Sequence, residues 1–125
     1  MIIGTGLDII EIQRIKNSIR KYSPKFEQRV FSSEEINYCQ SQGDPGKHFA
    51  ARFAVKEAVS KCLGTGISGA LGFKDMEVIH EESGKPVLKM TGKGKELFKK
   101  LKIKTIHISI SHDNTYAIAH AIAEQ

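Results

Sequence analysis

The apolar and polar positions of the chain form their clearest pattern between residues 48 and 63, where ten of sixteen residues are apolar. They spread almost completely around a helical wheel, which is typical of a buried helix. Four charged residues interrupt the pattern, and buried charges are costly unless they pair or bind an ion. At 100° per residue Arg52 and Lys56 share one side, while Glu57 and Lys61 lie one turn apart on another. The segment therefore predicts either a polyanion site, with or without a metal, or a solvated Glu57–Lys61 pair.

Shorter patterns predict the other elements. Alternation and β-branched residues predict a strand at 2–9, and helical periodicity follows from about 11 to 21. Ser33, with acidic residues after it, is the predicted cap of a helix that runs to about 42. Further patterns predict a helical turn at 26–31, a loop at 43–46, a glycine-rich connector at 64–72, a hairpin at 75–80 and 86–90, a helix at 91–101, and strands at 105–111 and 115–123. This order indicates an α+β fold, with an antiparallel sheet packed on the long buried helix.

Size and charge narrow the possible functions. The 125 residues fit one domain, spanning 1–125, because two halves would each be marginally stable. A net charge of +5 favours an anionic partner, such as nucleic acid, a phosphorylated cofactor or an acidic protein. The charge is spread along the chain, which weakens the nucleic-acid interpretation. The first residues do not resemble a signal peptide and no apolar run is long enough for a membrane span, so we expect a cytoplasmic protein.

Two carboxylates are candidates for a metal site. Asp8 lies near the end of the first predicted strand among apolar neighbours, where it either caps the next helix or binds a cation. Together with Glu57 it forms a possible Mg²⁺ site, because Mg²⁺ typically takes one or two carboxylates and completes its shell with water and phosphate oxygens. Arg52, Lys56 and Lys61 would then neutralise a diphosphate that bridges the metal.

The strand at 105–111 carries a second group of candidates. Its isoleucines are predicted to face one way, and His107, Ser109 and Ser111 the other. His112 follows at the turn, where it is either a phosphate or ribose contact or an ordinary turn residue. The consecutive Ser-His-Asp at 111–113 is not a catalytic triad, because adjacent side chains cannot form that relay. We expect His107 and His120 to be structural.

Three motifs in this order resemble the holo-acyl-carrier-protein synthases, the small phosphopantetheinyl transferases. They are Gly6-Leu-Asp8-Ile with Arg14-Ile close behind, Arg52-Phe-Ala-Val-Lys-Glu57-Ala-Val-Ser-Lys61 running into Gly64-Thr-Gly66, and Ile108-Ser-Ile-Ser-His112 with Tyr116-Ala. A weaker match is Phe26-x-x-Arg29-Val ahead of Ser33-Glu34. The resemblance implies the phosphopantetheinyl transferase fold. It also implies transfer of 4′-phosphopantetheine from coenzyme A to a serine of apo-acyl-carrier protein, releasing adenosine 3′,5′-bisphosphate, in fatty acid biosynthesis.

The resemblance also implies roles for individual residues. Asp8 and Glu57 match the family's Mg²⁺ ligands, and Lys61 matches the lysine near the diphosphate, so that Glu57 and Lys61 are the catalytic candidates. Arg52, Lys56 and His112 would surround the nucleotide and its phosphates. Residues expected to face the acidic carrier protein are Arg14, Arg20, Lys21, Lys25 and Arg29. The general base stays open between Glu57, a metal-bound water and Glu34.

The family is typically a homotrimer with coenzyme A between subunits, and the apolar pattern is consistent with association. The helix at 48–63 and the isoleucines of 106–110 have too little polar surface for the outside of a small monomer. Two other classes of function remain: a nucleic-acid-binding module, and a non-catalytic adaptor for an acidic partner. An Mg²⁺-dependent transfer assay with coenzyme A distinguishes all three.

Overall fold

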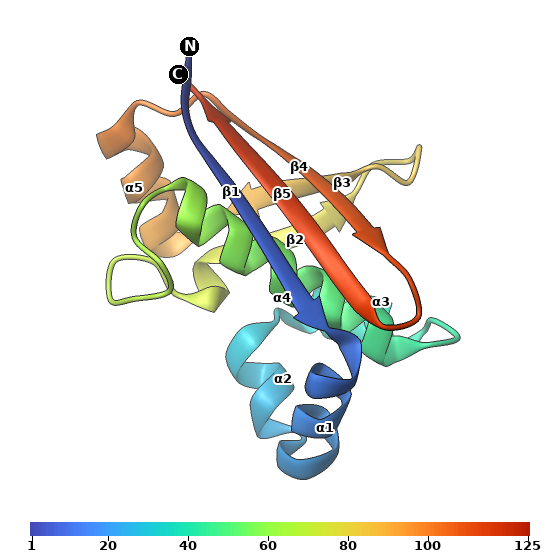
Figure 1. Cartoon of the computed structure of the whole chain (residues 1–125). Helices are drawn as coiled ribbons and strands as arrows, with labels where there is room; N and C mark the ends of the chain where they lie inside the picture. The colour runs from blue at the N-terminus through green and yellow to red at the C-terminus, as the bar shows by residue number, and fades with distance from the viewer.

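The computed structural model describes all residues 1–125 and confirms the predicted order of helices and strands (Figure 1). The elements are β1 (Ile2–Glu11), α1 (Ile12–Tyr22), α2 (Lys25–Val30), α3 (Ser33–Gln40), α4 (Pro45–Cys62), the short 3₁₀ helix η1 (Phe73–Asp75), β2 (Met76–His80), β3 (Pro86–Met90), α5 (Gly92–Leu101), β4 (Thr105–His112) and β5 (Tyr116–Glu124). No helix is both long enough and apolar enough to cross a membrane.

Two helix starts differ from the prediction. The cap of α3 is Ser32 rather than Ser33, because Ser32 stands three residues before Glu35 and the two form a reciprocal capping box. The long helix α4 begins at Pro45, inside the segment predicted to be a loop. Proline suits the first turn of a helix, since its missing N–H would have no partner there.

The strands form two antiparallel sheets. β5 lies between β1 and β4 in a three-stranded sheet, and β2 pairs with β3 in a separate hairpin. Figure 1 shows the first strand and the last running side by side, with the two chain ends close together. Helix α4 packs behind this sheet, as the predicted α+β fold requires.

Small side chains allow α4 to lie directly on the sheet. A Cβ atom on Gly4 would be 2.3 Å from the carbonyl oxygen of Cys62, and one on Gly6 would be 1.9 Å from that of Ala58. The residues that β5 turns toward α4 are all alanines: Ala117, Ala119, Ala121 and Ala123. Because side chains alternate along a strand, Asp8 is the next residue of β1 after Gly6 on the face that meets α4.

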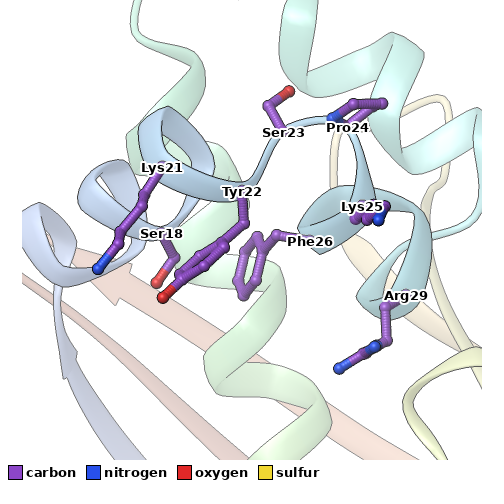
Figure 2. A pocket seen from close by; sticks show the side chains of 8 residues that line it. All are labelled: Ser18, Lys21, Tyr22, Ser23, Pro24, Lys25, Phe26 and Arg29. Carbon is purple, nitrogen blue, oxygen red and sulfur yellow. The ribbon is translucent and has the colours of Figure 1, made fainter.

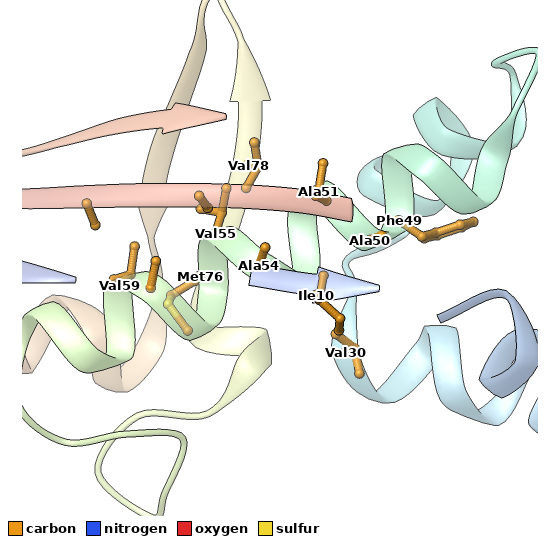
Figure 3. Close-up of a cluster of buried hydrophobic side chains, with 14 of the residues drawn as sticks. Ile10, Val30, Phe49, Ala50, Ala51, Ala54, Val55, Val59, Met76 and Val78 are labelled. Carbon is orange, nitrogen blue, oxygen red and sulfur yellow. The ribbon is translucent and has the colours of Figure 1, made fainter. Parts of the chain in front are cut away.

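Helix α4 is buried within a single chain. Twelve of its eighteen residues are buried, and Figure 3 shows its side chains among those of β1, α2 and the β2–β3 hairpin. The isoleucines of β4 pack against the same core. The expectation that α4 needs another subunit to cover it is therefore wrong, because the chain's own strands and helices cover it. The isoleucines of β4 are only partly buried.

The uncovered apolar surface lies on the opposite side of the three-stranded sheet. Leu7 and Ile9 of β1 are each 59% exposed, and their neighbours on β5, Tyr116 and Ile118, are 42% and 38% exposed. We call this surface, centred on Leu7, Ile9, Tyr116 and Ile118, the outer face. Exposed apolar side chains that adjoin one another are typical of interaction surfaces.

Candidate functional site

The structure brings Asp8, Glu57 and Lys61 together where β1 crosses α4. The Nζ atom of Lys61 lies 3.0 Å from Oδ1 of Asp8 and donates to the carbonyl oxygen of Leu7 at 3.1 Å. The side chain of Asp8 is 15% exposed and that of Lys61 is 52% exposed, so the ion pair is open to solvent on the lysine side. Gly4 and Gly6 allow β1 to approach α4, and the same close approach places Asp8 beside the helix.

The two carboxylates of this cluster, when ionised, carry more negative charge than the one ammonium group of Lys61 neutralises. Burial raises the pKa of Glu57, the nearby Asp8 carboxylate raises it further, and Lys61 acts in the opposite direction. A single ammonium group therefore faces two carboxylates. No third Asp, Glu, His or Cys joins them to form a larger metal-binding group. Two oxygen-donor side chains nevertheless fit Mg²⁺, which usually keeps several waters and takes phosphate oxygens from a substrate.

Asp8 and Glu57 line a cavity that adjoins a second cavity lined by several basic residues. The carboxylate cavity has a volume of about 370 Å³ and is lined by Asp8, Ile9, Ile10, Arg14, Ile15, Ser18, Phe26, Phe53 and Glu57. It shares Ser18 and Phe26 with a larger cavity of about 610 Å³ between α1 and α2 (Figure 2). That second cavity is lined by Ser18, Lys21, Tyr22, Ser23, Pro24, Lys25, Phe26 and Arg29.

Four of the five cations predicted to face an acidic protein line these two adjoining cavities. Arg14 belongs to the carboxylate cavity, while Lys21, Lys25 and Arg29 belong to the larger one. Arg20 is elsewhere: it donates to Asn17 at 3.0 Å and lines a third cavity, which contains Asp44. The structure therefore gathers Arg14, Lys21, Lys25 and Arg29 next to the carboxylates but does not bring Arg20 to them.

A separate cavity of about 390 Å³ lies on another side of α4. It is lined by Tyr38, His48, Ala51, Arg52, His80, Pro86, Ile110, Ser111 and His112. Arg52 and His112 thus line the same cavity. This cavity shares no lining residue with the carboxylate cavity, because Arg52 and Glu57 are five residues apart and project from different sides of the helix. We call it the histidine cavity.

Lys56 lines none of these cavities. Its side chain is fully buried, and Nζ lies 2.7 Å from Oε1 of Glu35 and 2.8 Å from the carbonyl oxygen of Val30. The other carboxylate oxygen of Glu35 accepts from the N–H of Val78 at 2.9 Å. The structure thus does not place Lys56 where it could contact a nucleotide, because α3 and β2 cover that side of α4. We assign it a structural role.

The sequence reasoning missed three residues of the histidine cavity: Tyr38, His48 and His80. His48 precedes Arg52 by four residues, so helical spacing alone could have placed the two on one side of α4. Tyr38 and His80 reach the cavity from α3 and from β2. No local pattern in the sequence indicates that these elements meet α4.

Comparison with known proteins identifies the family of the chain. The sequence profile of the 4′-phosphopantetheinyl transferase superfamily matches residues 4–121. The chain is 42% identical over 124 residues to the holo-[acyl-carrier-protein] synthase of Koribacter versatilis, covering 99% of each chain. It is 40% identical to the enzyme of the same name from Geotalea daltonii over the full length of both.

Solved structures of such enzymes have the same fold. The holo-acyl-carrier-protein synthase of Neisseria meningitidis superposes with a TM-score of 0.94 at 32% identity and covers all of both chains. The Helicobacter pylori enzyme, solved in complex with coenzyme A, gives a TM-score of 0.87 at 32% identity over 96% of this chain and 99% of that one. Since the sequence match and the fold agree over nearly the whole chain, the protein belongs to the 4′-phosphopantetheinyl transferase superfamily, in the family of the holo-acyl-carrier-protein synthases.

Proposed function

We propose that this protein transfers 4′-phosphopantetheine from coenzyme A to a serine of apo-acyl-carrier protein and releases adenosine 3′,5′-bisphosphate. In this proposal the enzyme acts in the cytoplasm and serves fatty acid biosynthesis. The proposal rests on the Asp8–Glu57–Lys61 cluster. Its two carboxylates line a cavity that adjoins the basic, partly apolar cavity between α1 and α2. Relatives of similar sequence are named holo-[acyl-carrier-protein] synthases, and the Helicobacter pylori synthase, which has the same fold, was solved in complex with coenzyme A.

Asp8 and Glu57 are the residues that would hold Mg²⁺, which supplies positive charge to the diphosphate of coenzyme A. Lys61 would add its ammonium group to the same phosphates. Its position is fixed by Asp8 and by the carbonyl oxygen of Leu7. Such a site needs few side chains, because phosphoryl transfer depends mainly on positioning and charge stabilisation.

In the transfer step the serine hydroxyl attacks the pantetheine-side phosphorus in line. A bond from the serine oxygen to phosphorus forms while the bond to the bridging diphosphate oxygen breaks, so adenosine 3′,5′-bisphosphate leaves with that oxygen. The hydroxyl proton passes to a base at this site, for which Glu57, lining the cavity, is the candidate among the protein side chains. Glu34 lines none of the cavities described above and accepts a hydrogen bond from the Ser33 hydroxyl at 3.2 Å, which argues against it as the base.

The adjoining cavities between α1 and α2 suit an acidic carrier protein. We expect Arg14→Glu to raise the KM for the carrier by about tenfold or more while changing the KM for coenzyme A less than twofold, because opposite charge guides this encounter. Steady-state transfer rates with each substrate varied in turn provide the measurement. Arg20→Glu makes the same charge change on the same helix and should have the smaller effect. Equal increases in both KM values for Arg14→Glu would place Arg14 outside the carrier surface.

We also propose a homotrimer in which coenzyme A binds between subunits. The resemblance to the family supplies the three-fold symmetry, and two observations support association. The outer face is uncovered, and the carboxylate cavity and the histidine cavity share no residue within one chain. A closed ring of subunits covers such a face and can place a binding site at each seam.

This assembly predicts a clear effect of one surface substitution. We expect Ile118→Lys, at the centre of the outer face, to dissociate the protein into monomers and lower transfer activity by about tenfold or more, because a lysine ammonium is costly to bury in an interface. Ile79→Lys is the matched control, since Ile79 is exposed to nearly the same extent (39%, against 38% for Ile118) but lies on the β2–β3 hairpin. Light scattering over a dilution series gives the mass. A wild-type monomer fully active at micromolar concentration would rule out the shared site.

The test of the function itself is a transfer assay with coenzyme A, apo-acyl-carrier protein and Mg²⁺, followed by mass spectrometry of the carrier. We expect the carrier to gain the mass of one 4′-phosphopantetheine group and the gain to require Mg²⁺. No gain in mass at any Mg²⁺ concentration, with a carrier that a related synthase modifies, would contradict the proposal and favour a binding role for the basic surface.

A further inference from the structure

The excess positive charge of the chain lies in one segment. Residues 93–104 contain six of the nineteen Lys and Arg residues but only one of the fourteen Asp and Glu residues. The thirteen cations and thirteen carboxylates elsewhere cancel, so this segment accounts for the whole net charge of +5. We call its lysines the lysine patch. They are Lys93, Lys95, Lys99, Lys100, Lys102 and Lys104.

The ammonium groups of the lysine patch form no ion pairs and are open to solvent. All six lysines are exposed, and none of the ion pairs in the structure includes one of them. Only Lys93 makes a side-chain hydrogen bond, to the carbonyl oxygen of Gly69 at 2.9 Å. Leu97 and Phe98 of α5 pack against the core, so the lysines of this helix share its outward side. Figure 1 shows α5 at the end of the molecule away from α1 and α2, so the patch is separate from the cavities proposed for the carrier protein.

Exposed apolar side chains adjoin the lysine patch. Gln125 links the start of β1 to the end of α5, because its backbone N–H donates to the carbonyl oxygen of Met1 at 2.9 Å and its side chain donates to that of Leu101 at 3.3 Å. Met1 is 87% exposed and Ile2 is 59% exposed. Two uncovered apolar side chains therefore lie next to a group of unpaired ammonium groups.

This combination fits an anionic membrane better than a nucleic acid. Proteins that bind nucleic acid typically use the planar guanidinium of arginine on phosphates and aromatic rings on the bases. The segment 93–104 contains no arginine, and its one aromatic residue, Phe98, packs against the core. Lysine is a hydrated point charge, which attracts anionic lipid headgroups without a fixed geometry. A membrane interface also takes up apolar side chains, whereas the outside of a DNA duplex does not.

We propose that the lysine patch, with Met1 and Ile2 beside it, docks the protein on the surface of a membrane that contains anionic lipids. The contact is peripheral: the ammonium groups face the headgroups, and the two apolar side chains enter the interface. Salt weakens such a contact, because the reach of each charge is only about 8 Å at physiological ionic strength. This inference concerns a different surface from the proposed active site and does not depend on the outcome of the transfer assay.

Co-sedimentation of the whole wild-type protein with sucrose-loaded vesicles tests this proposal. One set of vesicles contains about one third phosphatidylglycerol in phosphatidylcholine, and the other contains phosphatidylcholine alone. At about 0.1 M salt we expect binding to the anionic vesicles to be at least about tenfold tighter, and at about 0.5 M salt we expect this difference to disappear. Equal binding to the two sets of vesicles, or a difference that salt does not change, would overturn the proposal without the use of any variant.

Variants assign the binding to the lysine patch. Replacing Lys95, Lys99 and Lys100 together by Gln should weaken binding to anionic vesicles by about 100-fold, because each lysine near such a surface contributes roughly a factor of five. Glutamine and lysine have similar helix propensities, so α5 should stay folded. The matched control removes three exposed cations from the other end of the molecule and should change vesicle binding less than about threefold. Its substitutions are Lys21→Gln, Lys25→Gln and Arg29→Gln. Equal losses in the two triple variants would mean that only net charge matters, and would overturn the proposal.

Ile2→Thr distinguishes a membrane from other polyanions. It should weaken binding to anionic vesicles by about fivefold, because less apolar surface enters the interface, and should leave binding to a short DNA duplex unchanged. Tighter binding of the wild type to the duplex than to anionic vesicles would make the lysine patch a nucleic-acid surface and overturn the proposal. A tenfold rise in the KM for the carrier protein in the α5 triple variant, measured without vesicles, would assign the patch to the carrier and overturn it as well.

Discussion

Asp8→Asn and Glu57→Gln should each lower the rate of phosphopantetheine transfer on the order of 100-fold or more, because a charge that stabilises the transferring phosphate is lost from a preorganised site. Both variants should keep the fold, since each replaces a carboxylate by an amide of the same shape. Rates measured by mass spectrometry over a range of Mg²⁺ concentrations, with circular dichroism for the fold, provide the test. Glu96→Gln, on the exposed surface of α5, is the matched control and should retain wild-type activity.

The Mg²⁺ dependence distinguishes ligands from general electrostatic contributors. If Asp8 and Glu57 hold the metal, the remaining activity of each variant should require more Mg²⁺ for half saturation than the wild type does. Wild-type rates for either variant at limiting Mg²⁺ would rule out the proposed site. A lowered rate with an unchanged Mg²⁺ requirement would mean that the carboxylate acts on the substrate rather than on the metal.

Glu57 should also lower the stability of the metal-free protein at neutral pH. Its pKa in the folded chain is raised above the ordinary 4.5, so the unfolded chain loses this proton first as the pH rises. The stabilising contribution of protonated Glu57 is complete below the ordinary pKa and is lost as the pH rises through the folded value. Glu57→Gln cannot ionise, so thermal unfolding without Mg²⁺ should give a higher Tm for the variant at about pH 7 and nearly equal values at about pH 4.

Much of this site follows from local patterns in the sequence. Period-two alternation places Asp8 on the same face of β1 as Gly4 and Gly6, and helical spacing places Glu57 one turn before Lys61. What the local pattern omits is the direct contact of β1 with α4. That contact depends on small residues from both elements, and their meeting is set by the pairing of the first strand with the last.

Lys56 is a residue whose surroundings local sequence patterns do not predict. Helical spacing correctly puts it on the side of Arg52, but it does not reveal what covers that side. In the structure α3 brings Glu35 to within 2.7 Å of Lys56, although the two are 21 residues apart in the chain. The capping box that starts at Ser32 was a local signal for the position of Glu35, while its partner comes from tertiary packing.

Breaking the buried Lys56–Glu35 ion pair should strongly destabilise the chain. We expect Lys56→Met to lower the free energy of unfolding by about 3–5 kcal/mol, because it leaves the Glu35 carboxylate buried without a compensating charge. That is a large fraction of the roughly 5–15 kcal/mol typical of a folded domain. Urea unfolding followed by circular dichroism gives the value. Lys16→Met is the control: its partner Asp44 is 3.2 Å away, the two side chains are 39% and 44% exposed, and the expected cost is at most about 1 kcal/mol.

A second substitution separates the charge effect from lost packing. Glu35→Gln in the Lys56→Met background removes the uncompensated charge and keeps an oxygen for the N–H of Val78, so it should recover at least about 1 kcal/mol of stability. Transfer assays below the unfolding transition then test the role of Lys56 itself. We expect the KM for coenzyme A to stay within about twofold of the wild-type value, because the ammonium group is shielded from solvent by α3 and β2. A cost no larger than that of Lys16→Met would contradict the predicted effect of the uncompensated Glu35 charge. A KM for coenzyme A that rises tenfold in folded protein would instead mean that Lys56 reaches the substrate.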